Sequence, residues 1–198
     1  LIELKSKYKD SNLEIHTGDI CDDFTLPRLM RGITGVFHLA AFKHVGLAET
    51  QGRECIKSNV IGSMNVLEEA VKNDVEFVIG ISTDKAANPS SLMGCSKKFM
   101  EKKLYELKNS NKKIFVSTVR FANVAFSNGS VLKYVVDRLI QKKEFGIPEN
   151  IKRFFITHNE ASNLCFKSLL KRNNKKIVIP NSKSFDKIDL TLTENLIK

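Results

Sequence analysis

Short apolar runs alternate along the chain with segments in which apolar residues recur every three or four positions. The apolar runs lie at residues 13–15, 35–41, 77–81, 114–124 and 177–180, and the segments with helical spacing at residues 51–72, 93–109, 130–143 and 160–172. Runs of this kind are typical of strands buried on both faces, and the spacing is typical of amphipathic helices. The alternation predicts an α/β fold: a Rossmann-like, doubly wound parallel sheet covered by helices.

Composition narrows the protein class. The 198 residues are 42% hydrophobic and 27% charged, which is ordinary for a globular protein. No apolar run reaches the roughly 18 residues that a bilayer span needs, so we expect no membrane segment in this part of the chain. The four cysteines and four histidines are scattered, without a CxxC pair or zinc-ligand spacing. We therefore expect reduced thiols, a cytoplasmic protein and no bound metal.

The net charge of +10 raises the question of nucleic-acid binding. The excess comes mainly from lysine doublets on separate predicted helices and turns, without an arginine-rich stripe or interleaved aromatic residues. This pattern favours a solvated lysine-rich surface and no nucleic-acid partner. A positive field also suits an anionic small-molecule substrate.

Three different polar groups directly follow the apolar run at residues 77–81. Thr83, Asp84 and Lys85 supply a hydroxyl, a carboxylate and an amine at the carboxyl end of a predicted strand, where open α/β sheets bind ligands. Taken alone, the pair Asp84–Lys85 favours the interpretation of a surface turn that carries a screened ion pair. Met93 and Lys97 are four residues apart on the next predicted helix, so they share one face.

A hydroxyl, a turn and a helical lysine make up the constellation of short-chain dehydrogenase/reductases, in which a tyrosine four residues before the lysine is normally the acid/base. Met93 stands in that place and cannot transfer a proton. The chain resembles, more closely, the nucleotide-sugar N-acetylhexosamine 4,6-dehydratases, which are extended short-chain dehydrogenase/reductases of bacterial polysaccharide and nonulosonic acid biosynthesis. The segments that carry the resemblance are residues 38–45, 58–60, 83–89, 93–97, 120–130, 152–157 and 160–161. Residues 120–130 and 147–157 look most like the branch assigned to legionaminic acid synthesis.

The resemblance implies NAD-dependent 4,6-dehydration of UDP- or GDP-N-acetylglucosamine to a 4-keto-6-deoxy sugar, with NAD rather than NADP reduced and re-oxidised within one turnover. It implies that Lys85 is the base at sugar C5, and that Asp84 is the acid that protonates the leaving C6 hydroxyl. Thr83 would hydrogen-bond the C4 oxygen, and Lys97 would hold the nicotinamide ribose. The group that deprotonates the C4 hydroxyl in the absence of a tyrosine is left open, with Lys97 or a water as the hypothesis.

Further residues receive binding roles through the same resemblance. The implied cofactor contacts are Asp19, Ile20, Leu39, Ala40, Ala41, Lys43, Asn59 and Lys97. The implied substrate contacts are Lys43, Asn123, Ser127, Gly129, Ser130 and Arg153. Residues 127–130 also precede a predicted helix, so their backbone N–H groups either receive a diphosphate or simply cap the helix after an Asn-Gly turn, and the two interpretations are compatible.

The chain has no G-x-G-x-x-G turn between a first strand and a helix, the usual cradle of a dinucleotide. We therefore expect a fragment of a longer protein, homo-oligomeric at full length, that binds NAD weakly or not at all by itself. Residues 1–125 would form part of an NAD-binding domain, and residues 126–198 part of a substrate-binding region. The alternatives are a nucleotide-sugar epimerase or ketoreductase on the same fold, and a truncated, non-catalytic remnant.

Overall fold

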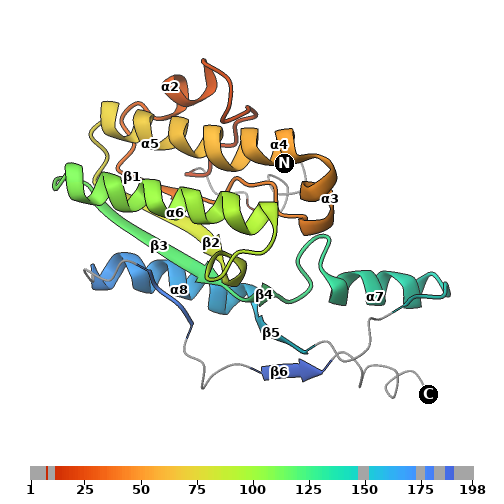
Figure 1. The fold of residues 1–198 in the computed structure, drawn as a ribbon. Coiled ribbons are helices and arrows are strands. Elements are labelled where there is room, and N and C mark those ends of the chain that lie inside the picture. The colour runs from red at the N-terminus through yellow and green to blue at the C-terminus, as the bar shows by residue number, and fades with distance from the viewer. Residues whose placement is uncertain (1–7, 9–11, 147–151, 173–176, 181–185, 190–198) are drawn as a thin grey trace.

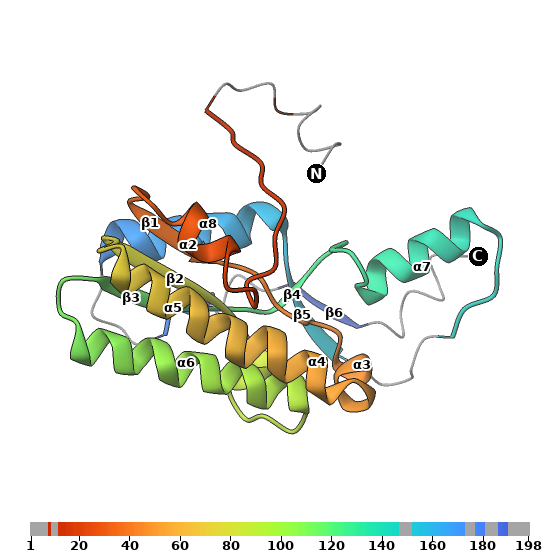
Figure 2. The same ribbon diagram turned by 90° about the horizontal axis from the view of Figure 1, so that it is seen from above.

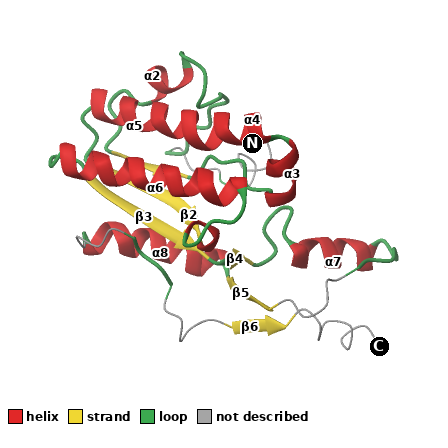
Figure 3. Ribbon diagram, viewed as in Figure 1, coloured by secondary structure: helices red, strands yellow, loops and turns green. Residues whose placement is uncertain are grey.

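A computed structural model describes residues 8, 12–146, 152–172, 177–180 and 186–189. Its first sheet consists of β1 (Gly35–His38), β2 (Phe77–Thr83) and β3 (Phe115–Phe121), in the order β1-β2-β3 (Figure 1; Figure 3). All pairs are parallel, with Phe77 of the central strand opposite both Gly35 and Phe115. The predicted α/β fold with a parallel sheet is therefore confirmed.

Helices cover both faces of this sheet. Figure 2 shows α5 (Ser63–Lys72) and α6 (Leu92–Ser110) on one side of the strands and α8 (His158–Lys171) on the other. Because successive strand residues point to opposite faces, neighbours in β2 belong to different cores. Val78 packs in the cluster with Met100 of α6, whereas Ile79 packs in the cluster with Cys165 of α8. In the described part of the chain, no helix is both long and apolar enough to cross a membrane.

The helix predicted at residues 51–72 is continuous but not uniform. It consists of α4 (Gly52–Ile56), a π-helical stretch η1 (Lys57–Gly62) and α5. π-Helical turns are rare and occur frequently at functional sites. Two short helices, α2 (Thr25–Leu29) and α3 (Val45–Thr50), were not predicted, because five or six residues are too few to display a helical period.

Side-chain caps fix where three of the helices begin. Ser91 accepts a hydrogen bond of 3.1 Å from the backbone N–H of Gly94 at the start of α6, and Ser130 accepts one from Lys133 at the start of α7 (Val131–Ile140). α8 begins with a reciprocal capping box between Thr157 and Glu160. Each cap satisfies an N–H group that has no partner within its helix.

A second sheet lies beyond the carboxyl end of the first. It contains β4 (Asn123–Val124), β5 (Lys152–Ile156) and β6 (Asp186–Asp189), with β4 parallel and β6 antiparallel to β5. The single strand predicted at residues 114–124 is therefore wrong, because the chain leaves β3 after Phe121 and enters the second sheet at Asn123. Leu132 of α7 packs against Phe155 of β5, so α7 lies beside this second sheet and away from α5 and α6 (Figure 1).

The two outer predicted strands also need correction. Residues 13–15 form no strand, and the side chain of Leu13 is exposed. A strand requires a backbone partner, and within the described residues the outer edge of β1 pairs with no other segment. Residues 177–180 contribute only a parallel bridge between Val178 and Val119, in which Val178 donates to the carbonyl of Thr118 at 2.7 Å.

Candidate active site

The turn after β2 presents a hydroxyl, a carboxylate and an amine in succession. Thr83 ends the strand, and Asp84, Lys85 and Ala86 form the short 3-10 helix η2. The Thr83 hydroxyl donates to Oδ1 of Asp84 at 2.9 Å and accepts from the backbone N–H of Lys85 at 3.4 Å. Because β2 is the central strand, this turn lies at the middle of the sheet edge where parallel α/β folds bind ligands.

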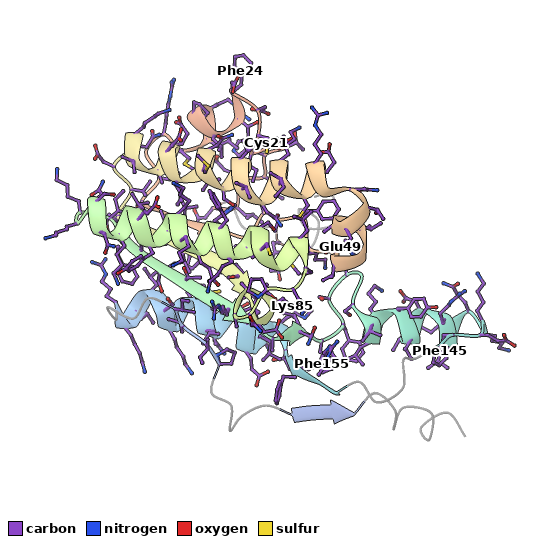
Figure 4. All side chains as sticks on the ribbon, viewed as in Figure 1. Cys21, Phe24, Glu49, Lys85, Phe145 and Phe155 are labelled. Carbon is purple, nitrogen blue, oxygen red and sulfur yellow. The ribbon has the colours of Figure 1, made fainter. Side chains whose placement is uncertain are left out.

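The Lys85 amine lies between the two sheets. Its Nζ donates to Oδ1 of Asp84 at 3.1 Å and to Oδ1 of Asn123 at 3.4 Å. The amide nitrogen of Asn123 in turn donates to the carbonyl of Phe154 at 3.0 Å. Figure 4 shows Lys85 at the end of the first sheet, with Phe155 on the neighbouring strand β5. The Lys85 and Asp84 side chains are 36% and 46% exposed, so their ion pair contributes little to stability and remains accessible to a ligand.

Lys97 is buried just behind this turn. It is 6% exposed, and its Nζ donates to the carbonyl of Ile81 at 2.7 Å. Burial lowers the pKa of Lys97 to about 8, although the nearby Glu101 carboxylate acts in the opposite direction. A lysine with such a pKa exchanges a proton readily near neutral pH, as acid–base catalysis requires.

Met93 fills space one helical turn before Lys97. It is 4% exposed and belongs to a cluster of buried side chains that includes Ala48 of α3 and Cys55 of α4, with Phe42 packed against them. The side chain in the place of the usual tyrosine is thus part of the core between α6 and the first helices.

Asn59 is fully buried, and its polar atoms are used within the protein. Its Oδ1 accepts from the backbone N–H of Phe42 at 2.7 Å, and its Nδ2 donates to the Phe42 carbonyl and to Oγ of Ser96, each at 2.9 Å. Asn59 therefore holds the segment after β1 in place. His38, at the end of β1, bonds Ser63 at 2.9 Å, and burial together with the charge of Lys97 lowers the pKa of His38 to about 4.

The segment that follows β1 meets the loop that precedes α7. Leu39 is 62% exposed and Ala40 is also exposed, with Ala41 half-buried. The Lys43 amine donates to the backbone carbonyl of Asn128. Gly129 has a φ of +71°, and a Cβ at this position would clash with the His44 ring. The structure thus brings together two segments that carry predicted cofactor and substrate contacts.

Ser127 and Ser130 belong to this loop and form hydrogen bonds within the loop and with the start of α7. The backbone N–H of Ser130 donates to the carbonyl of Ser127 at 2.9 Å, and the Ser130 hydroxyl caps α7. The capping interpretation of residues 127–130 is therefore correct, and it leaves the diphosphate interpretation as a prediction.

The remaining predicted contacts lie at both ends of the described chain. Asp19 accepts a hydrogen bond of 2.9 Å from the N–H of Cys21, and its carboxylate lies 3.8 Å from Nζ of Lys57. Ile20 packs against the hydrophobic cluster that contains Val78 and Met100. Arg153 is exposed on β5, two residues before Phe155, the residue that pairs with Asn123. Arg153 therefore belongs to the same small sheet as Asn123.

Two charged residues at the site were missed by the sequence analysis. Glu101 of α6 and Arg120 of β3 form an ion pair through two hydrogen bonds of 2.7 Å. The spacing offered a partial signal, because Glu101 follows Lys97 by four residues and so shares its helix face. The partner on β3 could not be identified, since it depends on the register between β2 and β3.

Comparison with known proteins identifies the family of this chain. A match to the polysaccharide biosynthesis protein family covers residues 2–198. A UDP-N-acetylglucosamine 4,6-dehydratase (inverting) of Campylobacter jejuni is 33% identical over 90% of this chain and 54% of its own length. A UDP-glucose 4-epimerase of Rickettsia canadensis is 34% identical over 82% of this chain and 48% of its own length. The chain thus spans about half the length of these curated relatives.

Solved structures share the fold. The X-ray structure of Pen from Bacillus thuringiensis superposes with a TM-score of 0.89 at 26% identity, covering 99% of this chain and 61% of the other. A dTDP-glucose 4,6-dehydratase from Streptomyces venezuelae, solved with NAD, superposes with a TM-score of 0.84 at 18% identity, covering 99% and 66%. The fold is therefore that of the Rossmann-like short-chain dehydrogenase/reductases, and the chain belongs to the polysaccharide biosynthesis protein family.

Proposed function

We propose that the protein carrying this chain catalyses the NAD-dependent 4,6-dehydration of UDP- or GDP-linked N-acetylglucosamine, giving a 4-keto-6-deoxy sugar. The observation that carries the proposal is the turn after β2, where Thr83, Asp84 and Lys85 lie together, with Asn123 as a second partner of the Lys85 amine. The resemblance of residues 120–130 and 147–157 supports a place in the legionaminic acid branch.

The described residues fit part of an NAD site. β1 ends at His38 opposite Gly80, so Leu39 and Ala40 follow β1 at the same edge of the sheet as Ile81, whose carbonyl binds Lys97. An exposed apolar segment and a buried lysine thus belong to one sheet edge, an arrangement that suits a nicotinamide riboside. Cofactor contacts are proposed for Leu39, Ala40, Lys97, Asp19, Ile20, Ala41 and Lys43. Asn59, which is fully buried, would act on the cofactor site through the backbone of Phe42. When bound, NAD would accept a hydride from sugar C4 and return it at C6.

The ion pair of Lys85 and Asp84 already contains the acid and the base of an elimination. A bound sugar would exclude water, and low dielectric disfavours two separated charges. Moving one proton from Nζ to Oδ1 across 3.1 Å gives a neutral amine and a neutral carboxylic acid. The amine then takes the C5 proton and the acid protonates the C6 oxygen. The C6–O bond breaks, water leaves, and a C5=C6 double bond forms.

Thr83 and Lys97 would act at the other end of the sugar. The Thr83 hydroxyl, which donates to Asp84 in the free protein, would hydrogen-bond the C4 oxygen instead. Lys97, with a pKa near 8, would be neutral in part at physiological pH and would take the C4 hydroxyl proton directly or through a water. Substrate contacts are proposed for Lys43, Asn123, Ser127, Gly129, Ser130 and Arg153.

The test uses the full natural polypeptide with UDP- and GDP-N-acetylglucosamine in D2O. Mass spectrometry should show a product lighter by one water that carries deuterium from the solvent. Lys85→Gln and Asp84→Asn should abolish water loss, while Lys103→Gln, which removes an exposed ion pair with Glu106 on α6, should not. Unaltered water loss in Lys85→Gln would refute the assignment of the base.

A 4-epimerase is the second candidate, because a UDP-glucose 4-epimerase is among the relatives. Epimerisation inverts C4 and needs no base at C5, so its product has the mass of the substrate. An inverted product of unchanged mass from either nucleotide sugar, with full activity in Asp84→Asn, would establish this reaction in place of dehydration.

A further inference from the structure

A buried ion pair joins α6 to β3 directly beneath the turn that carries Asp84 and Lys85. The two nitrogens Nε and Nη2 of Arg120 each donate a hydrogen bond of 2.7 Å to one oxygen of Glu101. The side chains of Glu101 and Arg120 are only 4% and 14% exposed. A planar guanidinium bound at both carboxylate oxygens has a defined orientation, which a single contact would not give.

The same ion pair also forms one hydrogen bond with a residue before the turn and one with a residue after it. Before the turn, the Ser82 hydroxyl donates to Oε1 of Glu101 at 2.7 Å. After the turn, Nη2 of Arg120 donates to the carbonyl of Ala86 at 3.4 Å. The residues between these two attachment points are Thr83–Asp84–Lys85, so the ion pair contacts both ends of the segment that carries the proposed acid and base.

Strand register explains why Arg120 reaches this position. Ser82 of β2 lies opposite Arg120 of β3, which places Ser82 and the guanidinium beside the same carboxylate. Glu101 lies one helical turn after Lys97, and its charge opposes the effect of burial on the pKa of Lys97. One carboxylate thus contacts the strand end before Thr83 and acts electrostatically on the buried lysine.

Stability alone is a weak explanation for such a pair. Removing two charges from water costs free energy, and apolar residues of similar size often replace a buried ion pair without loss of stability. Acid–base chemistry, in contrast, depends on groups held within a fraction of an ångström of the reacting atoms. The hydrogen bonds to Ser82 and Ala86 attach the ion pair to the residues on each side of Thr83–Asp84–Lys85.

We propose that Glu101 and Arg120 are positioning residues, which fix the two ends of the Thr83–Asp84–Lys85 turn and so hold the Lys85 amine against Asp84 and Asn123. This inference rests on the proposed function for its catalytic consequence. Neither residue touches the reacting atoms. Their removal should lower the rate of the chemical step and leave substrate affinity almost unchanged.

The decisive variant replaces both partners: Glu101→Met with Arg120→Met. It removes the two charges together, so neither Glu101 nor Arg120 is left buried without the other and the protein should remain folded. Arg120→Lys is the second variant, since it keeps the positive charge and loses the bidentate geometry. Glu106→Gln is the matched control, because Glu106 makes an exposed 2.8 Å ion pair with Lys103 on the same helix. Circular dichroism and thermal melting establish folding for each variant of the full natural polypeptide.

Two readouts separate positioning from general stability. The first is kcat and KM for water loss: kcat should fall between about tenfold and about 100-fold in the double variant, with KM changed less than about twofold. The second needs no activity. Individual lysines of the free protein are acetylated with acetic anhydride over a range of pH values and analysed by mass spectrometry. The labelling profile of Lys85 should change in the double variant and in Arg120→Lys, and that of Lys103 should not.

A folded double variant with wild-type kcat and an unchanged Lys85 labelling profile would overturn the inference. If the wild-type protein loses no water from either nucleotide sugar, the proposed function fails, and the labelling result still decides the positioning role. In that case an altered Lys85 profile supports the positioning of the turn, and an unaltered profile refutes it.

Discussion

The ammonium of Lys97 donates a 2.7 Å hydrogen bond to the main-chain oxygen of Ile81, two residues before Thr83. This contact joins α6 to the carboxyl end of β2 through a cation that is almost completely buried. Burying an ammonium disfavours its charged form. The consequence is a pH-dependent stability that can be measured without substrate or cofactor.

The first prediction concerns Lys97 and alkaline pH. The folded-state pKa of about 8 lies below the ordinary value of 10.5, so between these values the unfolded chain binds more protons and stability rises with pH. Relative to Lys97→Met, the wild-type free energy of unfolding should therefore rise by about 2 kcal/mol between about pH 7.5 and about pH 9.5. Urea denaturation at both pH values measures this difference.

Lys102→Met serves as the control for that comparison, because Lys102 is an exposed lysine of the same helix. The free energy of unfolding of Lys102→Met should differ from that of the wild type by the same amount at both pH values. A difference between wild type and Lys97→Met that does not change with pH would show that Lys97 is not destabilised in its charged form.

The second prediction concerns His38 and acidic pH. The folded-state pKa of about 4 lies below the ordinary value of 6.5, so the unfolded chain takes up a proton first and stability falls as the pH drops below 6.5. Between about pH 7.5 and about pH 5 the wild-type protein should lose about 2 kcal/mol relative to His38→Gln. The amide nitrogen of glutamine can replace the ring nitrogen that bonds Ser63.

The exposed His158 supplies the matched variant, His158→Gln, which should follow the wild-type pH profile. Denaturation curves at the two pH values are the measurement. Equal acid sensitivity of wild type and His38→Gln would contradict the buried, neutral state of His38.

The third prediction concerns Gly129. Its φ of +71° lies in the left-handed region, and an added Cβ would meet the His44 ring. Gly129→Ala should therefore destabilise the protein by at least about 1–2 kcal/mol, the cost of that backbone conformation. Combining Gly129→Ala with His44→Ala should restore only the part of the lost stability that comes from the clash with the ring. Thermal melting compares the two single variants with the double variant.

Gly46 provides a control of opposite sign. It lies in α3 with nothing within 4 Å of an added Cβ. Gly46→Ala should be neutral or stabilising by up to about 1 kcal/mol, because alanine is the better helix former. If Gly129→Ala is no more destabilising than Gly46→Ala, residues 127–130 do not adopt the described loop.

The fourth prediction concerns the start of α8. The Thr157 side chain accepts from the backbone N–H of Glu160 at 3.1 Å, and the Glu160 carboxylate accepts from the backbone N–H of Thr157 at 2.7 Å. Thr157→Ala removes the cap and should cost about 1 kcal/mol in the free energy of unfolding. Ser162→Ala, an exposed change inside the same helix, should alter it by less than about 0.5 kcal/mol. Equal effects of the two would exclude the capping box.

The central part of the fold could be predicted because local pattern and global architecture agree there. The apolar run before Thr83 became β2, and the helical period after Pro89 became α6, so the turn between them was located from sequence alone. Lys97 was expected to share a helix face with Met93, and its hydrogen bond to Ile81 shows that it reaches the carboxyl end of β2.

Other features depend on distances that the sequence does not contain. The apolar run at residues 114–124 continues past Ala122, so nothing in it signals that Asn123 begins a strand of another sheet. Asn59 lies on a predicted helix, but the π-helical stretch and the backbone of Phe42 decide where its amide points. The pairing of Glu101 with Arg120 requires the register of two strands.

Asn123 makes the site a composite of two structural units. The proposed acid Asp84 and the proposed base Lys85 follow a strand of the first sheet, yet one hydrogen-bond partner of Lys85 comes from β4 of the second. Sequence divergence in the second sheet and in α7 can therefore alter the surroundings of Lys85 without any change to the turn itself. On such a scaffold, new substrate preferences can evolve through changes in the second sheet while the turn after β2 stays unchanged. Position 123 is the point at which a change in the second sheet would directly affect Lys85.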